Sequence, residues 1–135
     1  VVLQNQLNTA MKKTEGNKSL TLNLALSYSG REEILNAVRL LINDVQKGSI
    51  DRVDEQVFQS YLYTRDIPDP DLLIRTSGEM RISNFLLWQI AYTEIYVTDT
   101  LWPDFREEAY LEALSEYMKR ERRFGSVKEN FSGRA

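Results

Sequence analysis

Residues 71–105, DLLIRTSGEMRISNFLLWQIAYTEIYVTDTLWPDF, decide the fold of this 135-residue chain. The stretch opens with three apolar residues, 72–74, which lie between a proline and the pair Ser77-Gly78. A short apolar run bounded by turn residues predicts a buried strand that ends in a tight turn. The apolar run 84–92 then predicts a helix, and residues 94–98 predict a second short strand. Strand, helix and strand in this order are typical of a parallel sheet.

Two arginines and a serine follow the first of these strands. Arg75 stands where the strand is predicted to stop, Arg81 follows the turn, and Ser83 is the predicted N-cap of the helix. In an open α/β sheet, ligands bind beyond the carboxyl ends of the strands, and guanidinium groups suit phosphate oxygens. Taken singly, an arginine at a strand end is usually solvated or ion-paired, and a serine N-cap is usually only a cap. Together on one strand, turn and helix they favour a diphosphate-binding site.

The rest of the chain also combines a strand with helices. Leucines at every second position from Leu20 to Leu26 predict a strand. Ser29 and Glu32 have the spacing of a capping box, at the start of an amphipathic helix that ends near Gly48. Further helices are predicted over residues 1–13, over residues 51–63 and from residue 102 onward. We therefore expect an α/β fold, a parallel β-sheet flanked by helices.

Composition limits the chemistry and the partners. The net charge of −3 argues against a general nucleic-acid binder, because phosphate backbones demand a basic surface. The sequence contains no cysteine and no histidine, so a bound metal would be a hard ion held by carboxylates, with Mg²⁺ the first choice. No run of 18 apolar residues and no signal peptide is visible, which predicts a cytoplasmic protein.

The segment RTSGEMRISNFLLWQIAYTEIYVTDTLWPDF strongly resembles the C-terminal signature of the cis-prenyltransferases, the undecaprenyl diphosphate synthase family. The resemblance extends back through LTLNLALSYSGREEI and forward through ERRFG, so it covers most of the chain. Family members join isopentenyl diphosphate to an allylic diphosphate with Mg²⁺ and form cis double bonds. The resemblance implies elongation from a farnesyl-type primer to a long polyprenyl diphosphate, here undecaprenyl diphosphate for the cell-wall lipid carrier. It also implies a homodimer, with peripheral contact to the inner membrane through the lipid product.

The resemblance also implies roles for individual residues. Arg75, Arg81 and Ser83 would hold the isopentenyl diphosphate, and Glu94 would help to bind metal and diphosphate. Without the resemblance, Glu94 would be expected to face solvent or to pair with an arginine. Arg123, in an Arg-x-Gly motif, would reach across the dimer to the neighbour's diphosphate. Leu20 begins its predicted strand at the end away from the diphosphates, and it would form the floor of the tunnel for the growing chain.

The sequence departs from the family in three places. Ser77 stands where the family often has glycine, and Met80 stands where it often has histidine and can neither donate a proton nor carry charge. The family's metal-binding catalytic aspartate lies in an N-terminal loop that this sequence lacks, so we expect that residue upstream of Val1 and no catalytic residue within these 135. Residues 1–125 are thus interpreted as the C-terminal portion of a single domain, with a mobile tail over residues 126–135.

Two alternatives remain open at this point. The chain could be the non-catalytic subunit of a heteromeric cis-prenyltransferase, although such subunits tend to lose the two arginines and the serine that stand here. A generic phosphate-binding α/β module is the other alternative, but neither a Walker nor a GxGxxG motif is present.

Overall fold

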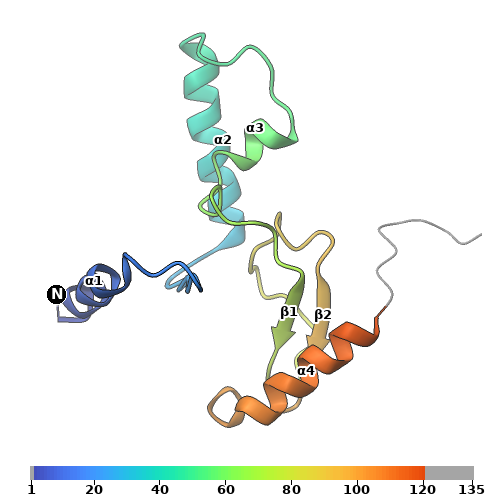
Figure 1. The fold of residues 1–135 in the computed structure, drawn as a ribbon. Helices are drawn as coiled ribbons and strands as arrows, with labels where there is room; N and C mark the ends of the chain where they lie inside the picture. The colour runs from blue at the N-terminus through green and yellow to red at the C-terminus, as the bar shows by residue number, and fades with distance from the viewer. Residues whose placement is uncertain (1, 121–135) are drawn as a thin grey trace, which may run out of the picture.

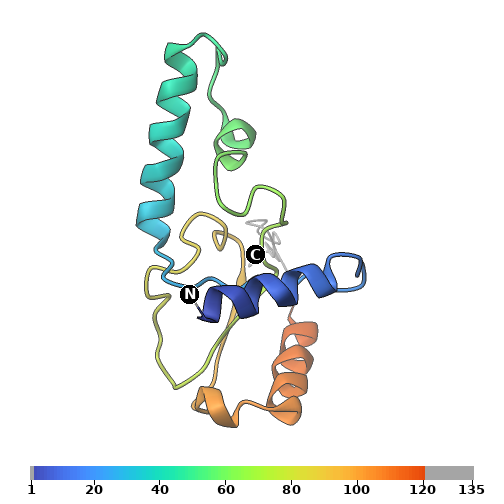
Figure 2. The same cartoon turned by 90° about the vertical axis from the view of Figure 1, so that its left-hand side faces the viewer.

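The computed structural model describes residues 2–120. Two parallel strands lie between helices, with α2 projecting away from one end of the sheet and α4 lying at the other (Figures 1 and 2). The elements in chain order are α1 (Val2–Thr14), α2 (Gly30–Gln46), α3 (Glu55–Gln59), β1 (Leu72–Arg75), β2 (Glu94–Val97), the 3-10 helix η1 (Trp102–Asp104) and α4 (Glu107–Lys119). This arrangement confirms the α/β class.

The sheet confirms the two strands predicted from the central stretch. β1 and β2 pair in parallel, with Leu72 opposite Glu94 and Arg75 opposite Val97. Because side chains alternate between faces along a strand, Arg75 and Val97 share one face of the sheet, whereas Glu94 lies on the other. α4 packs against β2, and its C-cap residue Arg120 donates to a Glu94 carboxylate oxygen at 2.9 Å.

α2 begins and ends where the sequence predicts. Ser29 is its N-cap in an extended conformation, and its hydroxyl accepts from the Glu32 amide at 3.3 Å. Only this half of the capping box forms, because the Glu32 carboxylate pairs with Arg39 instead of returning to the N-cap. Gly48, at a φ of 72°, follows the helix in the left-handed region that favours glycine.

The strand predicted over residues 20–26 is wrong. These residues form neither helix nor strand, and their leucines are exposed, from 55% for Leu24 to 82% for Leu20. A strand requires a hydrogen-bonded neighbour, and β1 with β2 is the only sheet within residues 2–120. Alternating leucines therefore identify a segment suited to a sheet without supplying its partner strand. Leu20 instead lines an open groove of about 780 Å³ with residues of α1 such as Met11.

The helix predicted over residues 84–92 is also wrong, and Ser83 caps no helix. The segment is a series of turns, and three of its first residues have positive φ: 48° at Ser83, 62° at Asn84 and 46° at Leu86. Side-chain and backbone bonds of Asn84 to the start of α2 hold this conformation in place of a helix.

The remaining helices differ from prediction mainly in length. α1 forms nearly as expected, α3 is much shorter than residues 51–63, and α4 begins only at Glu107 because η1 and the extended Phe105 precede it. The few buried apolar side chains of the described part lie on α2, after α3 and on α4: Ala37, Leu41, Leu62 and Ala113.

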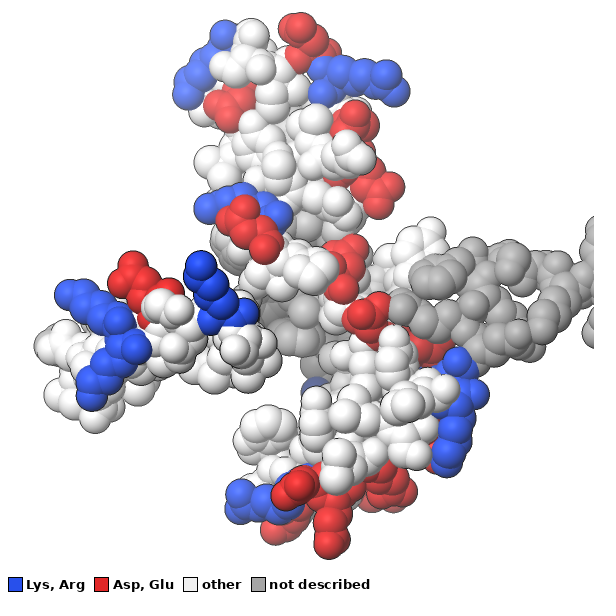
Figure 3. Space-filling view, viewed as in Figure 1, with Lys and Arg blue, Asp and Glu red and all other residues white. Residues whose placement is uncertain are grey.

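The surface carries both signs of charge. On the face shown in Figure 3, acidic and basic side chains alternate over α2, whereas over α4 the acidic ones gather at the lower edge with basic ones to either side. No helix within residues 2–120 is long and apolar enough to cross a membrane.

Candidate functional site

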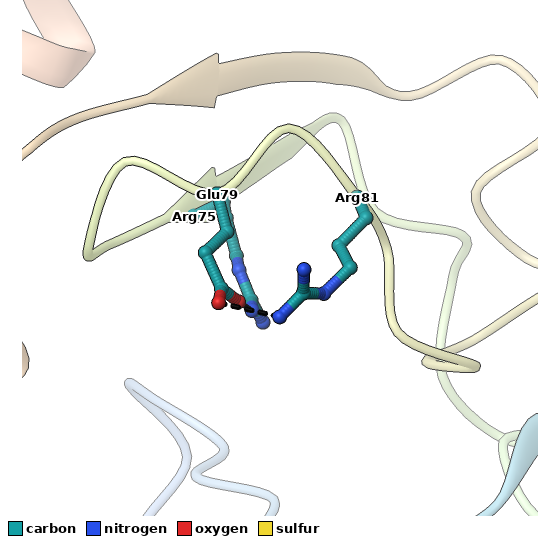
Figure 4. A network of polar contacts seen from close by, with 3 residues as sticks. All are labelled: Arg75, Glu79 and Arg81. Atoms are coloured by element: carbon teal, nitrogen blue, oxygen red, sulfur yellow. Dashed lines mark hydrogen bonds and ion pairs between the residues drawn. The ribbon is translucent and has the colours of Figure 1, made fainter.

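Arg75 and Arg81 converge beyond the end of β1, and we call this pair the arginine clamp. One carboxylate, that of Glu79, lies between them: Oε2 accepts from Arg75 and Oε1 from Arg81 (Figure 4). The Arg75 side chain is 32% exposed and that of Arg81 is 65% exposed. The Arg75 Nε atom is buried without a hydrogen-bond partner. The clamp is therefore already formed around an anion, and Arg75 retains an unused donor.

The turn between β1 and Glu79 fixes the position of the clamp. Ser77 and Gly78 have φ values of 71° and 69°, which confirms the predicted tight turn. The Gly78 amide donates to the Thr98 carbonyl at 2.8 Å, so the turn is tied to the segment that follows β2. A Cβ atom on Gly78 would lie 2.5 Å from an Asp99 carboxylate oxygen. Glycine suits the backbone angle, and a larger residue here would have to displace the Asp99 side chain.

A hollow of about 220 Å³ lies beside the clamp. Its walls combine the charged side chains of Arg75, Glu79 and Arg81 with apolar ones from both strands and from the following loop: Leu73, Met80, Ile82, Ile95 and Val97. The strand residues of this set lie on one face of the sheet. The site thus joins a cationic end to an apolar wall, a combination that suits an anion carrying a short hydrocarbon chain.

The structure does not bring Glu94 to the clamp. Glu94 begins β2 on the opposite face from Arg75, three residues before Val97, the partner of Arg75. At about 3.3 Å per residue, it is displaced by about 10 Å along the strand. Its carboxylate accepts from Arg120, so Glu94 pairs with an arginine, as its position in the sequence alone predicts.

The other predicted site residues lie in three places. Ser83 is exposed, two residues after Arg81. Leu20 lies in the groove beside α1, and Arg123 lies outside the described residues.

The described residues do not fit a Mg²⁺ site on their own. No group of three acidic side chains gathers within residues 2–120. Glu94 is engaged by Arg120, and Glu79 is engaged by both arginines of the clamp. A divalent cation needs several oxygen ligands, so the acidic groups of the described part do not assemble a complete set.

Asn84 closes the N-terminus of α2. Its carbonyl accepts from the Gly30 amide at 2.8 Å, its side-chain oxygen accepts from the Arg31 amide at 2.9 Å, and its amide nitrogen donates to the Ser29 hydroxyl. Gly30 permits this contact, because a Cβ there would lie 2.9 Å from Leu87 Cγ. The segment that follows Ser83 is therefore docked onto the first turn of α2.

A buried carboxylate, Glu33, holds the same junction. It is 1% exposed and accepts from the Tyr28 hydroxyl, from the Tyr63 amide at 2.9 Å and from the Gln89 side chain at 3.1 Å. Gln89 also donates to the Thr64 hydroxyl at 2.9 Å. Burial of Tyr28 and its hydrogen bond to Glu33 raise the Tyr28 pKa well above its ordinary value of 10.0. The network joins α2 to two loops that are far apart in sequence.

Sequence reasoning missed Glu79, Asn84 and Glu33. For Glu79 a signal existed, since an acidic residue between two arginines in RTSGEMR indicates an ion-paired turn. No comparable signal marks Asn84 or Glu33. Apart from Tyr28, which lies 5 residues before Glu33, their partners lie at least 30 residues away along the chain, which only the tertiary structure reveals.

The chain is similar in sequence to isoprenyl transferases and undecaprenyl diphosphate synthases. The profile of the family described as "Putative undecaprenyl diphosphate synthase" matches residues 2–125. An "Isoprenyl transferase" of Heliobacterium mobile is 54% identical over 125 residues, covering 91% of this chain and 48% of the relative. The "Ditrans,polycis-undecaprenyl-diphosphate synthase ((2E,6E)-farnesyl-diphosphate specific)" of Pasteurella multocida is 51% identical over 129 residues, covering 94% and 54%. The chain thus spans about half the length of the curated relatives it matches.

Two solved structures of prenyl diphosphate synthases are also similar to this chain. One match is the crystal structure of lavandulyl diphosphate synthase from Lavandula x intermedia in complex with dimethylallyl diphosphate. It has a TM-score of 0.86 and 42% sequence identity, and the matched region covers 92% of this chain and 54% of the synthase. A probable undecaprenyl diphosphate synthase from Campylobacter jejuni has a TM-score of 0.75 and 32% identity, covering 92% and 56%.

Proposed function

Since this chain belongs to the undecaprenyl diphosphate synthase family, we propose that it works as an isoprenyl transferase that elongates a cis-prenyl chain. Its substrates in this proposal are isopentenyl diphosphate and an allylic diphosphate of the farnesyl type. The allylic carbon–oxygen bond breaks and its diphosphate leaves. The isopentenyl double bond then attacks the resulting carbocation, and a proton is lost. The product is a polyprenyl diphosphate, which we propose to be undecaprenyl diphosphate for the cell-wall lipid carrier.

The arginine clamp carries the proposal. Arg75 and Arg81 converge beside a hollow with apolar walls. Isopentenyl diphosphate needs cationic donors for its head and a dry wall for its five-carbon chain. We infer that the clamp holds the diphosphate head while Ile82 and Ile95 face the hydrocarbon, so that the double bond is presented to the carbocation.

Further roles belong to the proposal through the family resemblance. Ser83 would join the clamp on the diphosphate, and Leu20 would limit the tunnel for the growing chain. Glu94 would contribute to Mg²⁺ and diphosphate binding, which would require release of its ion pair with Arg120. Arg123 would act across a homodimer on the neighbour's diphosphate. Mg²⁺, when bound, would neutralise charge on the diphosphates, and a cytoplasmic location with peripheral contact to the inner membrane completes the proposal.

Alanine substitution of each clamp arginine tests this function in the complete natural polypeptide that contains the sequence. Losing a charge-assisted contact to phosphate costs about 2–4 kcal/mol, so Arg75→Ala should lower kcat/KM for isopentenyl diphosphate roughly 30- to 1000-fold. Arg81→Ala should cost less, because its side chain is twice as exposed. Arg39→Ala is the matched control, since Arg39 is a similarly exposed, ion-paired arginine on α2. Unchanged kinetics in both clamp variants would remove the clamp from the active site.

A further inference from the structure

One carboxylate occupies the place between the two arginines of the clamp. Each oxygen of Glu79 accepts from a different guanidinium group, so a ligand anion held by both arginines would use the same donors (Figure 4). We propose that Glu79 is an exchangeable counter-anion, which the incoming diphosphate displaces and which thereby limits how tightly the clamp holds it. This inference rests on the proposed function.

Charge makes the exchange necessary. Arg75 and Arg81 each contribute +1 and Glu79 contributes −1, so the three groups together carry +1. With Glu79 in place, the diphosphate would meet a like charge within contact distance, and like charges at that range repel. When the carboxylate moves away, the two arginines present +2 to the ligand.

The local structure makes the exchange easy. The Glu79 side chain is 37% exposed, and its neighbour Met80 is 85% exposed, so the carboxylate can rotate into solvent without entering the core. Ion pairs exposed to this extent are weak, each worth a factor of roughly 1.4 to 5 in an equilibrium constant. The backbone of the turn need not move, because the Gly78 amide stays bonded to Thr98.

Repeated elongation gives the exchange a purpose. In each condensation the diphosphate of isopentenyl diphosphate remains on the elongated product, and this product must leave the clamp before the next isopentenyl diphosphate binds. Once the clamp is saturated with isopentenyl diphosphate, tighter binding of the diphosphate no longer raises the rate. It only slows the departure of the elongated product from the clamp. Glu79 returns to the arginines as the product departs, and so assists release.

Glu79→Gln in the complete natural polypeptide tests the inference, with inorganic diphosphate as the probe and a chelator present. Since two weak ion pairs no longer compete, the Kd for diphosphate should fall about 2- to 25-fold, the product of the two factors given above. The KM for isopentenyl diphosphate should fall as well, and kcat should fall with it as product release slows. Glu79→Asp keeps the charge and should bind diphosphate like wild type. Glu32→Gln removes one ion-paired carboxylate from α2 and controls for net charge.

The outcomes separate the two proposals. Weaker binding in Glu79→Gln, or equal tightening in Glu79→Gln and Glu79→Asp, overturns the counter-anion role and leaves the clamp intact if Arg75→Ala still loses affinity. Tightening in Glu32→Gln equal to that in Glu79→Gln also overturns it, because the effect would then be one of net charge. If wild type binds no diphosphate, or binds it as weakly as Arg75→Ala, the proposed function and this inference both fail.

Discussion

Replacing Glu33 with alanine should destabilise the fold more than any surface change, because three donors, of which the Gln89 side chain is buried, lose a buried acceptor. The Tyr28 hydroxyl, the Tyr63 amide and the Gln89 side chain all donate to this carboxylate. Each buried donor left unsatisfied costs about 1–3 kcal/mol, which gives about 3–9 kcal/mol as an upper limit. Removing a buried charge and admitting water into the space offset part of this cost. We expect a net loss of about 2–4 kcal/mol in the free energy of unfolding.

Two variants make this prediction specific. Glu33→Gln keeps the shape and one acceptor oxygen, so it should lose only about 1–2 kcal/mol. Glu32→Gln, on the neighbouring but exposed residue, should lose less than about 0.5 kcal/mol. Urea unfolding followed by circular dichroism measures all three, and hydrogen exchange at the Tyr63 amide reports the local effect. Equal stability of the Glu33→Ala and Glu32→Gln variants would refute the network as a structural support.

Two further predictions concern Tyr28 and Gly78. Because the folded-state pKa of Tyr28 is raised, Tyr28 contributes fully to the free energy of unfolding below pH 10. Above pH 10 the unfolded chain loses the Tyr28 proton, and this contribution declines. Between pH 9 and 11, the free energy of unfolding of wild type should fall by up to about 1.4 kcal/mol more than that of Tyr28→Phe. Screening reduces this difference because Tyr28 is half-buried. Parallel pH profiles of the two proteins would contradict the prediction. Gly78→Ala should cost about 1–3 kcal/mol and weaken diphosphate binding, because its φ is 69° and the new Cβ meets Asp99. Gly16→Ala, where a Cβ meets nothing within 4 Å, is its control, and equal effects of the two would exclude strain at the turn.

The sequence predicted those elements whose determinants are local. β1, its turn at Ser77-Gly78 and the start of α2 at Ser29 follow from apolar runs, glycine and a cap within a few residues. The strand predicted over residues 20–26 and the helix predicted over residues 84–92 were wrong because the conformation of these segments depends on distant partners. Leucine alternation does not provide a neighbouring strand, and the apolar run that follows Ser83 is held as turns by bonds to α2.

The candidate site was predictable to the same extent. Arg75 and Arg81 come together as the strand–turn pattern implies, because the turn between them is short. The resemblance alone assigned Glu94 to metal and diphosphate binding, and that assignment stays a prediction; the parallel register places Glu94 at the other end of the sheet from Arg75 and on the other face. Register is a property of the paired strands, so no single-strand pattern could have revealed this.

Neither Ser83 nor the start of α2 offers free helix amides to an anion. A helix N-terminus attracts anions through its free amides, and the sequence suggested such a terminus beside the clamp. No helix begins at Ser83, and the first four amides of α2 already have acceptors: Gly30 and Arg31 donate to Asn84, and Glu32 and Glu33 donate to Ser29. We therefore expect a diphosphate to bind through the guanidinium groups of Arg75 and Arg81. Both are partly exposed, so their attraction for a diphosphate is screened by salt, and a competing carboxylate such as Glu79 is enough to tune it.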